Sequence, residues 1–98
     1  MLAVKLPSPH DILFLRGDIN YTEFHLVNGK KVVSSTTLLR YEEKFEGFVR
    51  VSRKHLVNPR YFLEYEKTGT SLSLKLTNNN KIKISRRRLN LVQGIIQK

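Results

Sequence analysis

The chain contains no cysteine. It can therefore form no disulfide and no thiolate metal site, and it has no thiol nucleophile. No apolar run approaches the roughly 18 residues that a membrane helix needs. One lysine, Lys5, lies near the start, but no hydrophobic segment follows it as in a secretion signal. These absences favour a cytoplasmic protein that does not cross a membrane.

The residue patterns of common catalytic sites are also missing. The three histidines lack the spacing of metal ligands, and we expect His25 on a strand and His55 in a basic loop. There is no phosphate-binding glycine loop and no Gly-x-Ser-x-Gly motif. Glu42 and Glu43 are adjacent on an expected helix, so their side chains point in different directions. We predict that the protein is not an enzyme, needs no cofactor or metal, and has no evident small-molecule substrate.

Acidic residues are scarce in this sequence. Eight Asp and Glu stand against 18 Lys and Arg, which gives a formal net charge of +10 in 98 residues. The hydrophobic share of 40% allows one core, and the length suits a single domain over residues 1–98. Such a charge implies a polyanionic partner, which could be DNA, RNA or an anionic membrane surface.

The positive charge is concentrated in two segments that contain no acid. The segment 49–61 carries Arg50, Arg53, Lys54, His55 and Arg60. The segment from residue 71 onward carries Lys75, Lys81, Lys83, Arg86, Arg87, Arg88 and Lys98. The acids Glu42, Glu43, Glu46, Glu64 and Glu66 lie elsewhere. We expect the two segments to fold onto one side as a binding face, with these acids turned away.

The hydrophobic pattern predicts a mostly β protein with short helices. Residues 1–9 form a lead-in segment, and the expected strands are 12–15, 21–27, 30–34, 48–51, 61–66, 71–76 and 81–85. Asn28-Gly29 predicts a tight hairpin between the second and third strands. A polar turn over 77–80 joins the last two, whose leucines and isoleucines alternate with polar residues. Strands do not alternate with helices, so a parallel α/β sheet is improbable.

Two short helices are expected between and after the strands. The hydroxyl side chains of Ser34–Thr37 can cap the first helix, and Gly47 ends it. Its apolar stripe consists of Leu38, Tyr41 and Phe45. The second is a C-terminal helix that begins at Arg86 and could be capped by Ser85. Its apolar stripe consists of Leu89, Val92 and Ile96.

Three polar or basic loops carry the candidate binding residues. Arginine can form a bidentate pair with guanine, whereas lysine and hydroxyl groups mostly hold phosphates. Three consecutive arginines at a helix start oppose the helix dipole, so a merely structural role would gain nothing from them. The candidates are Asn20, Tyr21, Arg50, Arg53, Lys54, Lys83, Ser85, Arg86, Arg87 and Arg88.

RNA and an anionic membrane surface fit the sequence less well than duplex DNA. A base-stacking RNA sheet would need exposed aromatics on strands in βαββαβ order, and the element order here differs. A membrane-surface helix would carry cations along one face, whereas here they lie together at its start. An RNA-binding domain and a module that binds an acidic protein partner remain as alternatives.

Several segments, taken together in order and spacing, resemble one family. They are Ile12–Leu15, Asn20-Tyr21, Asn28-Gly29, Lys30-Lys31, Leu38-Leu39, Phe48–Asn58 and Ile82–Arg87. The stretch 48–58 and the Ile84-Ser85-Arg86-Arg87 stretch are the specific ones. They resemble the LytTR DNA-binding domain over roughly residues 5–98.

This resemblance implies an elongated, antiparallel β fold that inserts loops into successive major grooves of bent duplex DNA. It implies a bacterial transcription regulator that acts as an output domain of the response-regulator type. By position, Asn20 and Tyr21 match the first contact loop. Arg53 with Lys54 matches the second, and Arg87 with its neighbours matches the third. Relatives bind paired direct repeats, so a second copy is expected on the DNA.

The chain also matches and departs from the family at single positions. Asn58 matches a family asparagine that closes the turn before Pro59. Ser52 stands where histidine is common, and Arg16 replaces a usual glutamate. Most relatives carry a receiver or membrane domain in front. The resemblance therefore fits either a stand-alone regulator or an excised domain, and it does not imply control by phosphorylation.

Overall fold

The computed structural model describes residues 6–69, 71–77 and 80–89. The strands are β1 (Ile12–Gly17), β2 (Thr22–Leu26), β3 (Lys31–Ser34), β4 (Val49–Ser52), β5 (His55–Val57), β6 (Phe62–Thr68), β7 (Ser71–Leu76) and β8 (Lys81–Ile84). The helical elements are α1 (Leu38–Lys44) and the 3-10 turns η1 (Pro9–Asp11), η2 (Pro59–Tyr61) and η3 (Arg86–Arg88).

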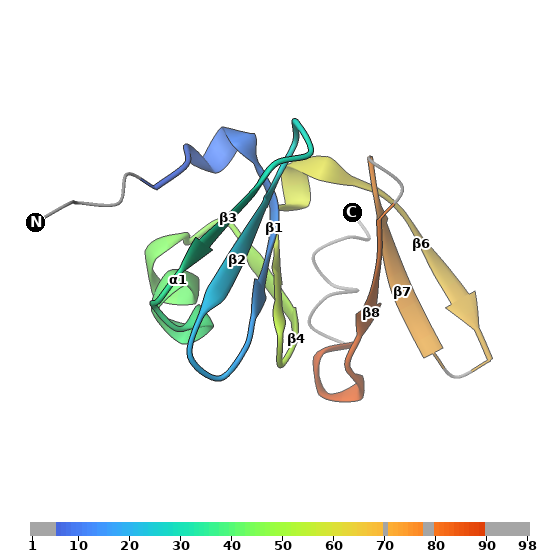
Figure 1. Cartoon of the computed structure of the whole chain (residues 1–98). Helices are drawn as coiled ribbons and strands as arrows, with labels where there is room; N and C mark the ends of the chain where they lie inside the picture. The colour runs from blue at the N-terminus through green and yellow to red at the C-terminus, as the bar shows by residue number, and fades with distance from the viewer. Residues whose placement is uncertain (1–5, 70, 78–79, 90–98) are drawn as a thin grey trace, which may run out of the picture.

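The strands form two antiparallel sheets. One has the order β3-β2-β1-β5-β4, and the other has the order β6-β7-β8. Figure 1 shows the five-stranded sheet between α1 on one side and the three-stranded sheet on the other. The principal axes measure 49 × 25 × 20 Å. The mostly β, antiparallel and elongated architecture is as predicted, but the strands divide into two sheets.

The central strand β1 explains this layered arrangement. All four residues from Ile12 to Leu15 are buried, because both faces of the strand are covered. Ile12 and Leu15 pack in the core under α1, whereas Leu13 and Phe14 pack against the three-stranded sheet. The pairing with β2 shifts its register between Ile12 and Phe14, which lets two consecutive residues face the same sheet.

Helix α1 begins at Leu38 as predicted, but its cap differs. Thr37 at the N-cap forms no side-chain capping bond. Instead, the Ser34 hydroxyl accepts the Thr36 N–H at 3.2 Å and hydrogen-bonds the Tyr41 hydroxyl at 2.5 Å. The Tyr41 ring meets the buried Phe24 ring edge-on at 4.8 Å between centroids. Ser34 thus ties the segment before the helix to the Tyr41 side chain, and Thr37 does not cap the free N–H groups of the first helical turn.

Strand β5 is absent from the sequence-based prediction. The stretch that was expected to be a basic loop instead forms a hairpin, with β4 ending at Ser52 and β5 starting at His55. Leu56 and Val57 are both fully buried on opposite faces of the sheet, so the three residues show no alternation. The hairpin at Asn28-Gly29 exists, but its loop spans 27–30, with Gly29 at a φ of +88°.

The C-terminal third agrees with the alternating pattern. Every apolar residue of β7 and β8 is buried against the five-stranded sheet. The prediction of a helix start at Arg86 is wrong in detail, because Arg86–Arg88 form a 3-10 turn and the Ser85 side chain makes no capping bond. The rest of the predicted helix lies outside the described residues. In the lead-in segment, Leu6 packs against the core under α1.

Candidate nucleic-acid interface

Three loops that are distant in sequence meet at one end of the molecule. They are the β1–β2 loop over 18–21, the turn Arg53-Lys54 between β4 and β5, and η3, all at the bottom of Figure 1. The Gly17 N–H donates to the Lys54 carbonyl at 2.7 Å, and the Ser85 N–H donates to the Val51 carbonyl at 2.8 Å. The structure therefore brings the three predicted loops together, and we call this end the basic face.

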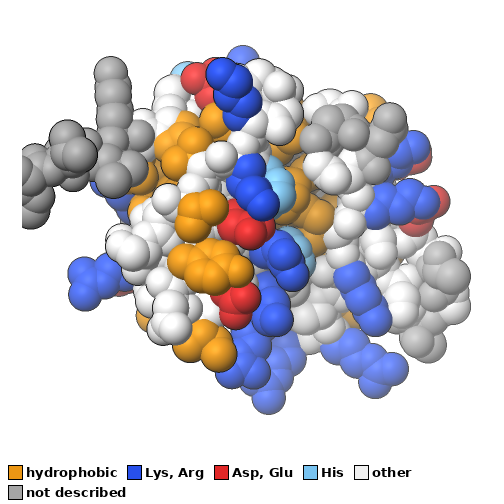
Figure 2. Space-filling view, in the orientation of Figure 1, with side chains coloured by type: hydrophobic (Ala, Val, Ile, Leu, Met, Phe, Trp, Pro, Cys, Tyr) orange, Lys and Arg blue, Asp and Glu red, His pale blue; other side chains and the backbone are white. Residues whose placement is uncertain are grey.

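Most cations of the basic face are uncompensated. Within the described residues, no ion pair is formed by Arg53, Lys54, Lys83, Arg86, Arg87 or Arg88. By contrast, Lys81 on the three-stranded sheet lies 2.8 Å from Glu66, and Lys75 lies 3.9 Å from Glu64. Figure 2 shows blue side chains gathered over this end. Such a cluster raises the local concentration of a polyanion.

The second and third loops also share hollows in the surface. Arg53, Arg87 and Arg88 line one hollow of about 730 Å³ together with Arg50 and Ser85. A second hollow of about 590 Å³ is lined from both loops by residues that include Lys54, Lys83 and Arg86. Guanidinium groups around one hollow repel each other unless an anion lies between them. The candidate residues of these two loops thus form one continuous surface.

Arg50 differs from the other candidates because its guanidinium bonds within the chain. The side chain is 12% exposed, and Nη1 lies 2.5 Å from a Glu42 carboxylate oxygen. Nε donates to the Ser52 carbonyl at 2.8 Å, and Nη2 donates to the Arg53 carbonyl at 2.6 Å. Arg50 therefore shapes the turn that presents Arg53. The expectation that the acids turn away from this face is wrong for Glu42, which anchors Arg50.

The first loop is held by Asp18, which sequence reasoning did not single out. Asp18 accepts the Ile19 N–H at 2.8 Å and the Tyr21 hydroxyl at 3.2 Å. These bonds, the backbone one first, lower the pKa of Asp18, and the same carboxylate raises the pKa of Tyr21. Tyr21 thus uses its hydroxyl inside the loop, although both Tyr21 and Asn20 are exposed. The sequence feature that could have predicted this contact is an aspartate three residues before a tyrosine in a short loop.

Ser52 and His55 support the second loop from inside. The Ser52 hydroxyl bonds His55 Nδ1 at 2.9 Å and accepts the Lys54 N–H at 3.2 Å. His55 is not a loop residue as predicted but the first residue of β5, half-buried near the Phe14 ring. Burial, and then the nearby Arg16, lower its pKa to about 4. It is neutral at neutral pH and adds nothing to the positive charge of the face.

We expect this depressed pKa to make stability depend on pH. His55 has a pKa of about 4 when folded against an ordinary value of 6.5, so the unfolded chain binds the proton more tightly. Stability should therefore fall as pH decreases from about 6.5 toward 4, by about 1 kcal/mol because solvent partly screens the site. Urea unfolding at pH 7 and pH 4.5 would show a smaller loss for His55→Gln. The exposed His10→Gln should behave like wild type, and equal losses in all three proteins would contradict the assignment.

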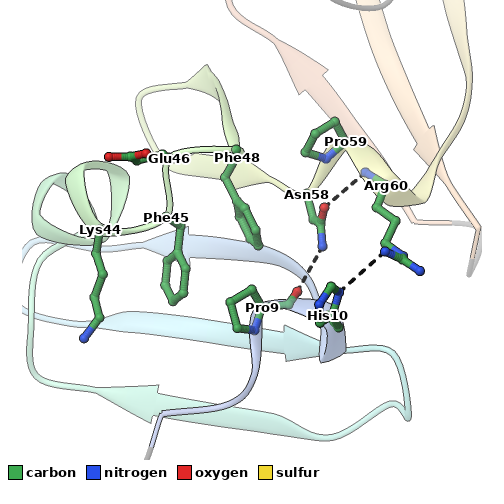
Figure 3. A pocket seen from close by; sticks show the side chains of 10 residues that line it. Pro9, His10, Lys44, Phe45, Glu46, Phe48, Asn58, Pro59 and Arg60 are labelled. Carbon is green, nitrogen blue, oxygen red and sulfur yellow. Dashed lines mark hydrogen bonds between the residues drawn. The ribbon is translucent and has the colours of Figure 1, made fainter.

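A separate hollow lies at the opposite end of β1 (Figure 3). It has a volume of about 510 Å³, and Pro9, Phe45, Phe48 and Arg60 are among its lining residues. The turn η1 precedes β1 here, whereas the first loop of the basic face follows it. This hollow therefore does not belong to the basic face.

Asn58 joins the elements around that hollow, as Figure 3 shows. The side chain accepts the Arg60 N–H at 3.1 Å. Its amide nitrogen donates to the Pro9 carbonyl at 3.1 Å and to the Ile12 carbonyl at 2.9 Å. It is 6% exposed and lies among η1, β1 and η2, away from the basic face. The structural role that was predicted for Asn58 is confirmed.

Two further classes of site are not found in the described part of the chain. No group of three or more His, Asp or Glu side chains there could hold a metal ion. No helix among the described residues is long and apolar enough to cross a membrane. The basic face, where the three loops join, is the candidate functional site.

Comparisons with known proteins show which family of domains the chain resembles. A family model described as the LytTr DNA-binding domain matches residues 3–97. A search of curated proteins gives no significant match. Among solved structures, the chain is similar to the LytTr DNA-binding domain of a protein assigned as a methyl-accepting/DNA response regulator from Bacillus cereus. That match has a TM-score of 0.83 at 14% identity and covers 94% of this chain and 86% of the other.

Proposed function

The chain belongs to the LytTR family of DNA-binding domains, and on that premise we propose that it is a sequence-specific transcription regulator that binds duplex DNA. One observation carries the proposal: three loops are joined at one end of the fold, and six cations there form no ion pair within the described residues, namely Arg53, Lys54, Lys83, Arg86, Arg87 and Arg88. The family is one of DNA-binding domains and not of enzymes, which agrees with the sequence-based prediction.

We infer that the loops enter the major groove and divide two tasks. Arg53 and Arg87 project from a turn and from η3, so they can reach base edges and pair with guanine. The groups expected to hold phosphates are Lys54, Lys83, Ser85, Arg86 and Arg88. Asn20 and Tyr21 would contact the DNA from the first loop, while Arg50 fixes the turn. Two copies would then bind paired direct repeats.

The RNA alternative is less well supported by the surface. Single-stranded RNA is bound largely by stacking on exposed aromatic rings. Among the described residues, the exposed large apolar side chains include a single aromatic, Tyr21, and its hydroxyl bonds Asp18. An acidic protein partner would also suit the charge, and it becomes an outcome of the test below.

Fluorescence anisotropy titrations across a salt series would test the proposal. The probes are a duplex selected from a random pool, the same sequence as single-stranded DNA, and the matching RNA duplex. We expect the selected DNA duplex to bind at least tenfold more tightly than the others. Equal affinity for all three, with no sequence enriched in the selection, would overturn the proposal in favour of general polyanion or protein binding.

Substitutions of single cations should separate base contacts from phosphate contacts. Arg53→Ala and Arg87→Ala should each weaken binding to the selected duplex by about 1–3 kcal/mol, or about 5-fold to 150-fold, and relax specificity. Lys83→Ala should weaken binding to every sequence alike and reduce the slope of log K against log salt by about 0.9. Titration of the selected and a scrambled duplex measures both effects. A sequence-selective loss for Lys83→Ala would contradict this division.

A further inference from the structure

Ile19 is an apolar side chain that the protein leaves uncovered. It is 85% exposed and lies in the β1–β2 loop of the basic face. Single exposed apolar residues are common on protein surfaces and need no explanation by themselves. Ile19 is distinguished by the rigidity of its loop and by its neighbours.

The loop holds Ile19 in a defined position. The Asp18 carboxylate accepts the Ile19 N–H at 2.8 Å, and the Asp18 N–H donates to the Tyr21 carbonyl at 2.8 Å. The preceding Gly17 is tied to the Lys54 carbonyl. The isoleucine is therefore fixed relative to the second loop before any ligand binds, which reduces the entropy cost of a contact.

The hollow beside Ile19 is lined by cations as well as by Asp18, which holds the loop. Ile19 lines a hollow of about 460 Å³ together with Arg53, Lys54 and a second exposed apolar residue, Leu39. A ligand held by Arg53 and Lys54 therefore lies beside an apolar side chain. Phosphates and deoxyriboses are the same at every nucleotide, so an apolar contact with them would select no base. In the major groove, by contrast, the C5 methyl group of thymine is an apolar feature of the base edges.

We propose that Ile19 contacts the methyl group of a thymine and so selects this base at one position of the site. The inference rests on the proposed function, because it requires duplex DNA in contact with the basic face. It makes the first loop a specificity element through an apolar contact in addition to the polar groups of Asn20 and Tyr21.

Deoxyuridine substitution tests this contact, because it removes the methyl group and nothing else. Each thymine of the selected duplex is replaced in turn, and affinity is measured by anisotropy. For wild type, we expect one position at which the change weakens binding about fourfold, the factor that corresponds to the burial of one methyl group. Ile19→Ala should bind the thymine duplex about as weakly as wild type binds the deoxyuridine duplex, and it should not distinguish the two.

Val33→Ala is the matched control, because Val33 is also β-branched and 54% exposed but lies on β3 outside the basic face. It should retain the full sensitivity to deoxyuridine. The inference is overturned if Ile19→Ala keeps that sensitivity, or if it only weakens the assembly of two copies on the DNA. In both cases the selected duplex still binds, so the proposed function stands. If no duplex is enriched at all, the proposed function and this inference fail together.

Discussion

Replacing Asn58 with alanine should lower the free energy of unfolding by about 2–4 kcal/mol, because buried backbone groups lose their partners. The side chain bonds the Arg60 N–H and the carbonyls of Pro9 and Ile12, and it is 6% exposed. Alanine cannot replace any of these bonds, and water has little access to the site. In a domain of this size, the loss should lower Tm by about 10–25 °C, as measured by circular dichroism.

Two further variants show which bonds matter. Asn28 makes the same local bond, because its Oδ1 accepts the N–H of the residue two positions on, but Asn28 lies on the surface. Asn28→Ala should therefore cost less than about 1 kcal/mol. Asn58→Asp keeps the acceptor and loses the amide donor, so it should be nearly as unstable as Asn58→Ala. If Asn58→Asp were as stable as wild type, the bonds to Pro9 and Ile12 would not be the source of the stability.

The parts of the fold with regular alternation could be predicted from the sequence. In β7 and β8, one face meets the core and the other meets water, so apolar and polar residues alternate strictly. The hairpin at Asn28-Gly29 was predicted because few residues other than glycine tolerate a φ of +88°. These features depend on residues that are close in the sequence, so the sequence pattern is enough to predict them.

Features that depend on distant contacts could not be predicted. Strand β5 has three residues, and its place between β1 and β4 follows from burial on both faces and not from a pattern. The Leu13 bulge, which turns two neighbours toward the second sheet, likewise depends on what covers β1. The division into two sheets was missed for the same reason.

The sequence predicted which loops carry the candidate residues, but not how these loops contact one another. The loops of Arg53 and of Arg86–Arg88 were found because cations gather there without acids. Their union with the first loop requires the bond from Gly17 to Lys54, which joins residues 37 apart. The sequence-based prediction also placed Arg50 among the DNA-binding candidates, since residue type alone does not show where a guanidinium points.

Arg50→Ala should therefore affect both stability and DNA binding, unlike the loss of a phosphate contact. Three bonds to Glu42, Ser52 and Arg53 would be lost, at a cost of about 2–3 kcal/mol in the free energy of unfolding, because solvent partly reaches Glu42. Affinity for the selected duplex should fall about tenfold or more, since Arg53 is presented by the turn that Arg50 holds. Urea unfolding and anisotropy measure the two effects.

The salt dependence distinguishes this positioning role from a direct contact. A residue that acts through Arg53 should leave the slope of non-specific binding against salt unchanged, whereas a phosphate contact contributes about 0.9 to it. Arg50→Lys keeps the charge but cannot form the forked bonds to Glu42 and the two carbonyls, so it should resemble Arg50→Ala. If Arg50→Lys were like wild type and Arg50→Ala lowered the slope, Arg50 would be a phosphate ligand.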